Sequence, residues 1–589
     1  MTLANFLEKF NFKKNPFLHS NADKEEKYLE QYFVKPNYFE EMWGDHEDPV
    51  SNIMYAPRGG GKTAQRLMFE KRGQEKKYNN LLIIKYTDHN LSNYKTTKEI
   101  DQSYHLIYLN RLMLLSFLNH LYSVGEYKYL FEFNYNERQY IYQLCKIYLY
   151  NTPKSFPKHA ISSIKTLEDR LVDIWRNFKD PLSEIIKVIS TAKGAEIDIS
   201  KMTLNKKVLM SHRDNFLNIK DLLSRVGLKS IYFLIDKVDE QSITGNDPIA
   251  SYEFIAPILK DLELLETPGI GFKFFLWDQL IPFCAESARP DRIRSYKYEW
   301  NYDSLRALFN KRIAVFSDNR YTDATNIYSD ENSLGRHIVF SQNSPRDLIR
   351  IGEKVLSEQF NTNRGEYKFQ RRTVNTAIEK FCEEKALELL KGNESYLKIL
   401  KRLNSVSFVL EEIYEKSNTL KILGLEDFVN NLQSQRLLKV INKSTIISKI
   451  PAYEYAFSDV CLARVACKSS SSLESFIYQK IRDCSRCGVF SYRNFDHRYY
   501  QCLECDNGLN PEKKEKLIGS GDNDLFKKVE YLRDRKIQIK DEVNKKTKKL
   551  IGSGDNDLFK KVEFLRDRKI QIKDEANKKT EDHNQEQDT

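Results

Sequence analysis

A glycine-rich segment after the first apolar run of the chain contains the residue types that most directly indicate chemistry. Consecutive backbone N–H groups can wrap a phosphate, a lysine can neutralise the next phosphate, and a following hydroxyl can bind Mg²⁺. The segment consists of Ala56, Pro57, Arg58, Gly59, Gly60, Gly61, Lys62 and Thr63. It predicts a P-loop that binds a nucleoside triphosphate together with Mg²⁺.

The neighbours of this segment are those that a P-loop needs. Residues 51–55 have the pattern of a buried strand, and residues 63–72 have the period of a helix. Ala56 replaces the usual first glycine and is small enough for that turn. The order of strand, glycine turn and helix disfavours the alternative of a chance glycine-rich turn.

Carboxylates after a second apolar strand supply the other half of the predicted site. Residues 231–235 form this strand, and Asp236 follows it in the position that holds the Mg²⁺ shell. Asp239 and Glu240 come next, and either could orient or deprotonate an attacking water. We favour Glu240 as the base. The alternative is that both acids only cap the following helix.

Two pairs of cysteines near the C-terminus have the spacing of metal ligands, C-x2-C-x14-C-x2-C. Four thiolates close a tetrahedral shell, so the pattern predicts a structural Zn²⁺ site rather than a catalytic one, and a redox dithiol is the less favoured alternative. The aromatic-rich residues 488–501 are expected to form the hairpin of a zinc ribbon. The predicted ligands are Cys484, Cys487, Cys502 and Cys505, while the five other cysteines stand singly, as buried thiols do.

The elements that must position these residues alternate between apolar strands and helical stretches. Residues 81–86 and 272–277 add two buried strands, so we predict an α/β fold in which helices cover a parallel sheet. Residues 100–225 are mostly helical in period and read as an insertion between strands. Farther along, the helix at 425–435 and the strands at 437–441 and 452–457 suggest a winged helix.

The length of the chain and a repeat near its C-terminus indicate several domains. A chain of 589 residues exceeds one hydrophobic core, and residues 517–549 and 550–582 are a tandem repeat with heptad-like spacing, typical of a short coiled coil or helical hairpin. The predicted domains are 1–45, a lead-in of short helices; 46–300, the P-loop core; 301–395, a helical lid; 396–475, winged-helix-like; 476–512, the zinc ribbon; and 513–589, the repeat tail.

Charge and hydropathy point to a protein of the cytoplasm. The first residues lack the basic and apolar regions of a signal peptide, and no apolar run reaches the roughly 18 residues of a membrane helix. The formal net charge of +11 favours an acidic partner such as DNA, although it is small beside 94 basic and 83 acidic residues.

The motifs together resemble those of the AAA+ group, and within it the bacterial ATPases related to the origin-recognition (initiator) clade. The resemblance covers about residues 10–360 and rests on Asn15-Pro16-Phe17, the P-loop, the strand that ends in Asp236, and Ser344-Pro345-Arg346-Asp347-Leu348. It implies a five-stranded core with a helical lid, and ATP hydrolysis coupled to movement of that lid.

Further site residues come from this resemblance alone. It implies that Asp278 positions the attacking water, that Arg346 on the lid contacts the γ-phosphate, and that Arg292 is an arginine finger presented to a neighbouring subunit of a homo-oligomer. A surface ion pair is the alternative for each arginine. Lys237 departs from the group's usual Glu, and the acids at 239 and 240 instead resemble NACHT and other STAND switch ATPases.

Three functions follow as hypotheses. The first is an ATP-hydrolysing switch or motor that acts on DNA or a DNA-bound partner, by analogy of architecture in bacterial defence or a mobile element. The second is a STAND-type scaffold in which nucleotide gates oligomerisation and an effector protein is the partner. The third is a P-loop that binds nucleotide without turnover.

Overall fold

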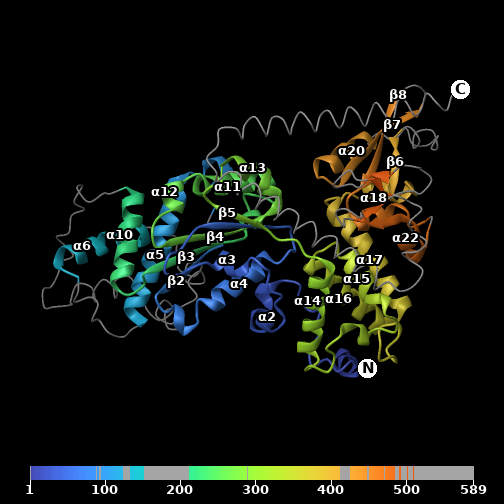
Figure 1. Cartoon of the computed structure of the whole chain (residues 1–589), viewed down its shortest axis with the longest axis horizontal. Helices are drawn as coiled ribbons and strands as arrows, with labels where there is room; N and C mark the ends of the chain where they lie inside the picture. Colours follow the sequence, from blue (N-terminus) through green and yellow to red (C-terminus); the bar gives the residue numbers. More distant parts are fainter. Residues whose placement is uncertain are drawn as a thin grey trace, which may run out of the picture. The chain divides into compact units, whose positions relative to one another are not determined.

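The computed structural model describes residues 2–123 except 88, 90, 92 and 93; 133–150; 211–410 except 288; 425–483 except 448, 449 and 470; and three segments at 490–492, 500–501 and 508–509 (Figure 1). Two compact units divide the chain, residues 1–384 and 385–589. The division falls inside helix α17 (Arg371–Leu389). The finer domain boundaries stay predictions.

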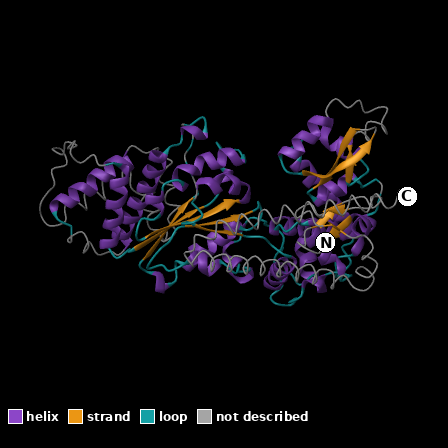
Figure 2. Cartoon of the chain, turned by 45° about the horizontal axis from the view of Figure 1, so that its top comes forward, coloured by secondary structure: helices purple, strands orange, loops and turns teal. Residues whose placement is uncertain are grey.

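A five-stranded sheet forms the centre of the first unit, and all its strand pairs are parallel (Figure 2). The order β2-β3-β4-β1-β5 places one strand, β4, between β1 and β3. The predicted α/β fold is therefore confirmed, and the four predicted strands are present. The strands are β1 (Asn52–Ala56), β2 (Leu81–Tyr86), β3 (Ser230–Ile235), β4 (Ile270–Trp277) and β5 (Arg294–Lys297).

Helices cover both faces of this sheet (Figure 1). Because side chains alternate along a strand, Phe233 and Phe272 pack into one core, while Tyr232 and Phe275 face the other way. The first face is covered by α5 (Gln102–Ser123), α10 (His212–Arg225), α11 (Pro248–Leu259) and α13 (Ile281–Ser287). The second is covered by α3 (Phe39–Trp43) and α4 (Lys62–Arg72).

The first and last parts of the predicted insertion at 100–225 pack on the central sheet. Helices α5 and α10 belong to the same buried cluster as the sheet, and the ring of Phe216 on α10 stacks on Phe233 with centroids 6.1 Å apart. Between them come α6 (Tyr135–Cys145) and a π-helical turn at Lys146–Tyr150. Residues 151–210 lie outside the described part of the chain.

The predicted lid is helical, and the N-terminal helices pack on it. It comprises α14 (Tyr302–Phe316), α15 (Asn332–Phe340), α16 (Pro345–Thr362) and the first part of α17. The lead-in forms α1 (Leu3–Lys9) and α2 (Glu26–Tyr32), as the sequence predicts. Arg312 of α14 lies against the ring of Tyr32, with its guanidinium carbon 4.9 Å from the ring centroid.

The second unit contains a three-stranded antiparallel sheet in the order β6-β8-β7. Its elements are α18 (Glu394–Arg402), β6 (Ser407–Val409), α20 (Leu425–Ser434), β7 (Leu438–Ile447), β8 (Ile450–Phe457), α21 (Val460–Ala466) and α22 (Leu473–Lys480). The predicted helix and ribbon are confirmed. The ribbon is longer than predicted because β7 continues through the polar residues 442–445, where the register shifts twice.

Two short strand pairs bracket the cysteine pairs. β9 (Ile481–Asp483) pairs with β10 (Phe490–Tyr492), and β11 (Tyr500–Gln501) pairs with β12 (Gly508–Leu509), both antiparallel. Within the described residues, β10 and β11 each pair with a strand on the far side of a cysteine pair, while most of the expected hairpin at 488–501 lies outside the described part, so that hairpin stays a prediction. Cys484, Cys487, Cys502 and Cys505 themselves, and the repeats at 517–582, lie outside the described residues.

The five single cysteines are buried, as predicted: Cys145, Cys284, Cys382, Cys461 and Cys467. No helix in the described ranges is long and apolar enough to cross a membrane.

A lysine is buried in the sheet, and its two hydrogen bonds within the described part of the chain go to backbone carbonyl groups. Lys273 of β4 is fully buried, and its Nζ donates to the carbonyl oxygens of Met42 at 2.7 Å and Val50 at 2.9 Å. Burial lowers the pKa of Lys273 to about 7 from the usual 10.5. The unfolded chain therefore binds more protons than the folded chain between these two values, and stability rises with pH in that window.

We predict that Lys273→Met removes this dependence. Between pH 7.5 and 9.5, the free energy of unfolding of the unmodified chain should rise relative to that of the variant by about 1.4 kcal/mol per pH unit. Urea unfolding of both proteins, followed by tryptophan fluorescence, measures the difference. The exposed Lys13 provides a matched control as Lys13→Met. Parallel pH profiles of the unmodified chain and Lys273→Met would contradict the prediction.

Candidate functional site

The glycine-rich turn between β1 and α4 carries backbone conformations that favour glycine. Gly59 and Gly61 have φ values of +74° and +91°. A Cβ atom at Gly59 would lie 2.6 Å from Ser344 Oγ and 2.9 Å from Arg346 Cβ, so the lid helix α16 touches the turn where a larger residue does not fit. The indole Nε1 of Trp300 donates to the Gly60 carbonyl at 2.8 Å and so also holds the turn.

Lys62 opens helix α4 and points back over the turn. Its Nζ lies 3.4 Å from each of the carbonyl oxygens of Ala56 and Pro57. Burial lowers the pKa of Lys62, while the charges of Asp239, Asp236 and Asp278 act in the opposite direction. The ammonium group thus lies within electrostatic reach of all three carboxylates, at the place where phosphate charge would be neutralised.

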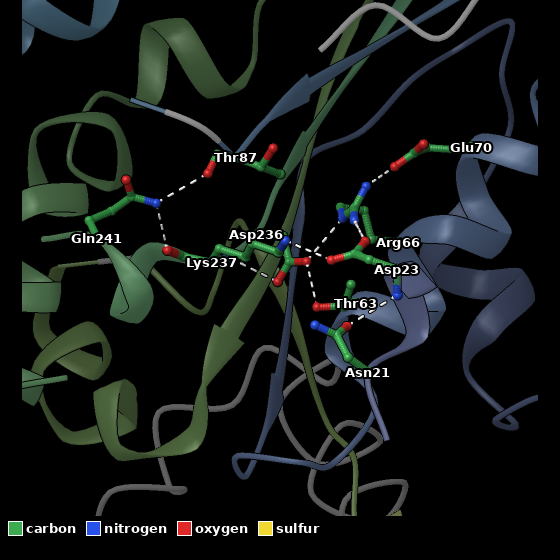
Figure 3. Close-up of polar contacts among 9 residues, drawn as sticks. All are labelled: Asn21, Asp23, Thr63, Arg66, Glu70, Thr87, Asp236, Lys237 and Gln241. Carbon is green, nitrogen blue, oxygen red and sulfur yellow. Dashed lines mark hydrogen bonds and ion pairs between the residues drawn. The ribbon is translucent and has the colours of Figure 1, made fainter. Parts of the chain in front are cut away.

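Asp236 and Thr63 meet at the carboxyl edge of the sheet (Figure 3). Thr63 Oγ1 donates to Asp236 Oδ2 at 2.9 Å, and only 1% of Asp236 is exposed. The backbone N–H of Lys237 donates to the other oxygen, Oδ1, at 2.9 Å. A hydroxyl beside a buried carboxylate is the oxygen donor set that Mg²⁺ prefers, so these two residues fit the predicted ion.

The two candidate bases differ in their surroundings. Asp239 is 4% exposed and accepts from Arg58 Nε at 3.0 Å. Arg58 also donates to Asn246 at 2.7 Å, and its guanidinium carbon lies 4.1 Å from the Trp277 ring centroid. The charge of Asp239 is therefore already balanced by an arginine that is itself fixed in place.

Glu240 reaches solvent at the end of the 3₁₀ turn Val238–Glu240. Partial desolvation raises the pKa of Glu240, and the charges of Asp239 and Asp236 raise it further, while Lys237 and Arg346 act in the opposite direction. A raised pKa improves a carboxylate as a proton acceptor near neutral pH. Of the two acids, Glu240 has the surroundings expected of a base.

Asp278 follows β4, the strand between those that carry the P-loop and Asp236. Burial raises the pKa of Asp278, and the charge of Lys62 acts against this shift. The parallel sheet therefore brings Asp278 to the same edge as Lys62, Thr63 and Asp236. Its predicted role in positioning water stays a prediction.

The two predicted arginines lie at different places. Arg346 is in the first turn of α16, and its backbone N–H donates to the Gly59 carbonyl at 3.4 Å, so it lies at the P-loop. Arg292 precedes β5 and is ion-paired with Glu266, which precedes β4. Both residues lie at the amino edge of the sheet, opposite the P-loop, so Arg292 does not join the site of its own chain. A role toward a second copy stays a prediction.

Two charged residues of the site were not predicted from the sequence. Arg66 donates from Nε to Asp236 Oδ2 at 3.0 Å. The carboxylate of Asp23 accepts hydrogen bonds from both Arg66 and Lys237. Helical spacing could have indicated Arg66, because it lies three residues after Thr63 on the same face of α4. Asp23 lies 40 residues before Thr63 in the sequence, and no motif links the two.

Comparison with known proteins gives distant structural likeness only. No protein-family model matches the chain, and no curated protein matches it. The Aeropyrum pernix ORC1 protein, solved in complex with DNA, is 11% identical over 79% of this chain and 98% of its own, with a TM-score of 0.32. The Aeropyrum pernix ORC2 protein, in ADPNP–ADP complexes, is 11% identical over 78% and 98%, with a TM-score of 0.27. Likeness at this level assigns no family or activity to the chain.

Proposed function

We propose that the chain is an AAA+-like ATPase that binds and hydrolyses ATP with Mg²⁺. The observation that carries the proposal is the 2.9 Å hydrogen bond between Thr63 and the buried Asp236, at the edge where the P-loop turn also lies. The sheet order, with β4 between β1 and β3, supports it because Asp278 reaches the same edge.

Each residue of the site has a separate role in ATP binding and hydrolysis. The backbone N–H groups of the turn bind phosphate oxygens, and Lys62 neutralises their charge. Mg²⁺, held at Thr63 and Asp236, supplies further charge neutralisation. Glu240 accepts the proton of the attacking water, and Asp278 helps to orient that water.

Asp239 has a different task in this proposal. Its ion pair with Arg58 ties the P-loop to the segment after Asp236, so it positions the loop rather than accepting a proton. Lid and loop are also coupled, since the turn at Gly59 contacts Ser344 and Arg346. Phosphate binding at the turn would therefore be sensed by α16, with Arg346 as the lid arginine.

We further propose that the second unit directs this ATPase to DNA or a DNA-bound partner. The order of α18, β6, α20 and the β7–β8 ribbon is the order of a winged helix, in which α20 would be the recognition helix. The strand pairs β9–β10 and β11–β12 each bracket one cysteine pair, which supports two Zn²⁺ knuckles formed by Cys484 with Cys487 and Cys502 with Cys505.

The catalytic proposal predicts different effects for the two acids. Glu240→Gln should lower kcat for ATP hydrolysis by about 100-fold or more and leave ATP binding in place, because it removes the proton acceptor but keeps the shape. Asp239→Asn should have a smaller effect on kcat, and Lys62→Ala should lose binding itself. Phosphate release and equilibrium ATP binding measure the two steps.

Three results would oppose this scheme. Full activity in Glu240→Gln together with its loss in Asp239→Asn would reverse the assigned roles. Binding without turnover in the unmodified chain would leave a nucleotide-binding protein that does not hydrolyse ATP. No binding at all would remove the proposed function.

The DNA proposal predicts salt-dependent binding of duplex DNA by the full chain, with affinity falling as salt rises. Asn430→Glu adds a negative charge to an exposed position of α20 and should weaken binding about threefold or more. Asn361→Glu makes the same change at an exposed position of α16 and should have no effect. Fluorescence anisotropy measures both. Equal effects of the two variants, or no binding, would contradict the proposal.

A further inference from the structure

A single carboxylate from the N-terminal segment contacts the cations that surround Asp236 (Figure 3). Asp23 lies in a 3₁₀ turn at Ala22–Lys24. Its Oδ1 accepts from Arg66 at 2.9 Å, and its Oδ2 accepts from Lys237 Nζ at 2.7 Å. Each oxygen of one carboxylate thus holds a different cation.

Both cations also belong to the surroundings of the Mg²⁺-binding carboxylate. Arg66 Nε donates at 3.0 Å to Asp236 Oδ2, the same oxygen that accepts from Thr63. The backbone N–H of Lys237 binds Asp236 Oδ1. Arg66 is also ion-paired with Glu70, and its side chain is only 4% exposed. The charge of Arg66 is therefore shared among Asp236, Asp23 and Glu70, while the ammonium group of Lys237 binds Asp23.

Asp23 is held in place by its neighbours along the chain, unlike an ordinary surface ion pair. The side chain of Asn21 accepts the backbone N–H of Asp23 at 3.1 Å. Two residues later, Glu25 Oε1 accepts a hydrogen bond from Arg312 Nη2 of α14 at 2.6 Å. Both of these side chains are at most 5% exposed. The position of Asp23 is thus fixed by a buried contact with the lid.

The electrostatic surroundings keep Asp23 ionised. Burial alone would raise the pKa of Asp23, but the hydrogen bond from Lys237 and the charges of Arg66, Lys237 and Lys85 outweigh burial and hold the pKa below its usual value. A full negative charge therefore faces these cations at neutral pH. Without it, Arg66 would be balanced mainly by Asp236 and Glu70.

We propose that Asp23 is a positioning residue for the Mg²⁺ site: it holds Arg66 and Lys237 and offsets their positive charge, so that less positive charge opposes the metal ion at Asp236. The proposal rests on the proposed function. It concerns how strongly Mg²⁺ strengthens nucleotide binding, and it leaves the phosphate contacts of the P-loop unchanged.

The test measures affinity for a fluorescent ATP analogue with Mg²⁺ and with EDTA, using the full chain. The ratio of the two affinities reports the metal contribution without any turnover. Asp23→Asn keeps the size of the side chain and should lower this ratio about fivefold, the effect of one unit charge at a partly buried site. Affinity in EDTA should stay within about twofold, since the metal is absent there.

A charge-balanced double variant separates positioning from structure. Asp23→Asn combined with Lys237→Met removes one charge of each sign, so the ratio should return to within about twofold of the unmodified value. Glu30→Gln is the matched control. It breaks another ion pair to α4, with Lys71, on the exposed surface, and it should leave the ratio unchanged.

The outcomes distinguish this inference from the proposed function. No analogue binding by the unmodified chain would remove the proposed function itself. Normal binding with an unchanged ratio in Asp23→Asn would overturn the inference alone. Equal losses with and without Mg²⁺, or no recovery in the double variant, would also overturn it. Should Asp23→Asn not fold, Lys237→Met alone should raise the ratio, and an unchanged or lowered ratio would overturn the inference.

Discussion

A buried carboxylate that must be balanced by positive charge is the constraint on which the first unit depends. Asp236 is almost fully buried. The desolvation of an isolated carboxylate in such a place would cost more free energy than the net stability of a typical fold. Its two oxygens are instead satisfied by Thr63, Arg66 and the backbone of Lys237. Because strands β1 and β3 are parallel, their carboxyl ends meet at one edge, which makes this arrangement possible.

At the same edge, the P-loop turn lies against the predicted lid. The turn at Gly59 has no room for a side chain because Ser344 and Arg346 lie against it, and the Gly60 carbonyl is held by Trp300. A phosphate group bound by the turn would therefore lie beside the start of α16. The N-terminal segment adds a second connection, since it contacts α14 through Glu25 and the Asp236 network through Asp23.

Much of this site could be predicted because its residues sit in local motifs. The P-loop, Asp236 and four of the five strands follow from apolar runs that end in glycine or acid. β5 lacks that signal, because its residues Arg294–Lys297 are mostly exposed at the edge of the sheet, and a last core strand after residues 289–294 was expected only from the resemblance. Asp23 was also missed, since its contacts with Arg66 and Lys237 depend on tertiary packing rather than on spacing.

Other differences have similar physical causes. The helical period of residues 100–225 predicts helices but not their neighbours, and α5 and α10 prove to cover the sheet. Arg292 lies in a motif carried over from a resemblance, and its place at the amino edge follows from the direction of β5. Glu240 was already favoured as the base from the sequence, and that assignment stays a proposal; the structure adds the ion pair between Asp239 and Arg58, which the sequence does not give.

The central claim is that Thr63 and Asp236 form the metal end of a nucleotide site. A crystal structure of the full chain with Mg²⁺ and a non-hydrolysable ATP analogue tests this claim most directly. We expect the phosphates in the turn at Gly59–Gly61 and the metal ion beside Thr63 and Asp236. An analogue bound elsewhere, or a metal ion that contacts neither residue, would contradict the claim.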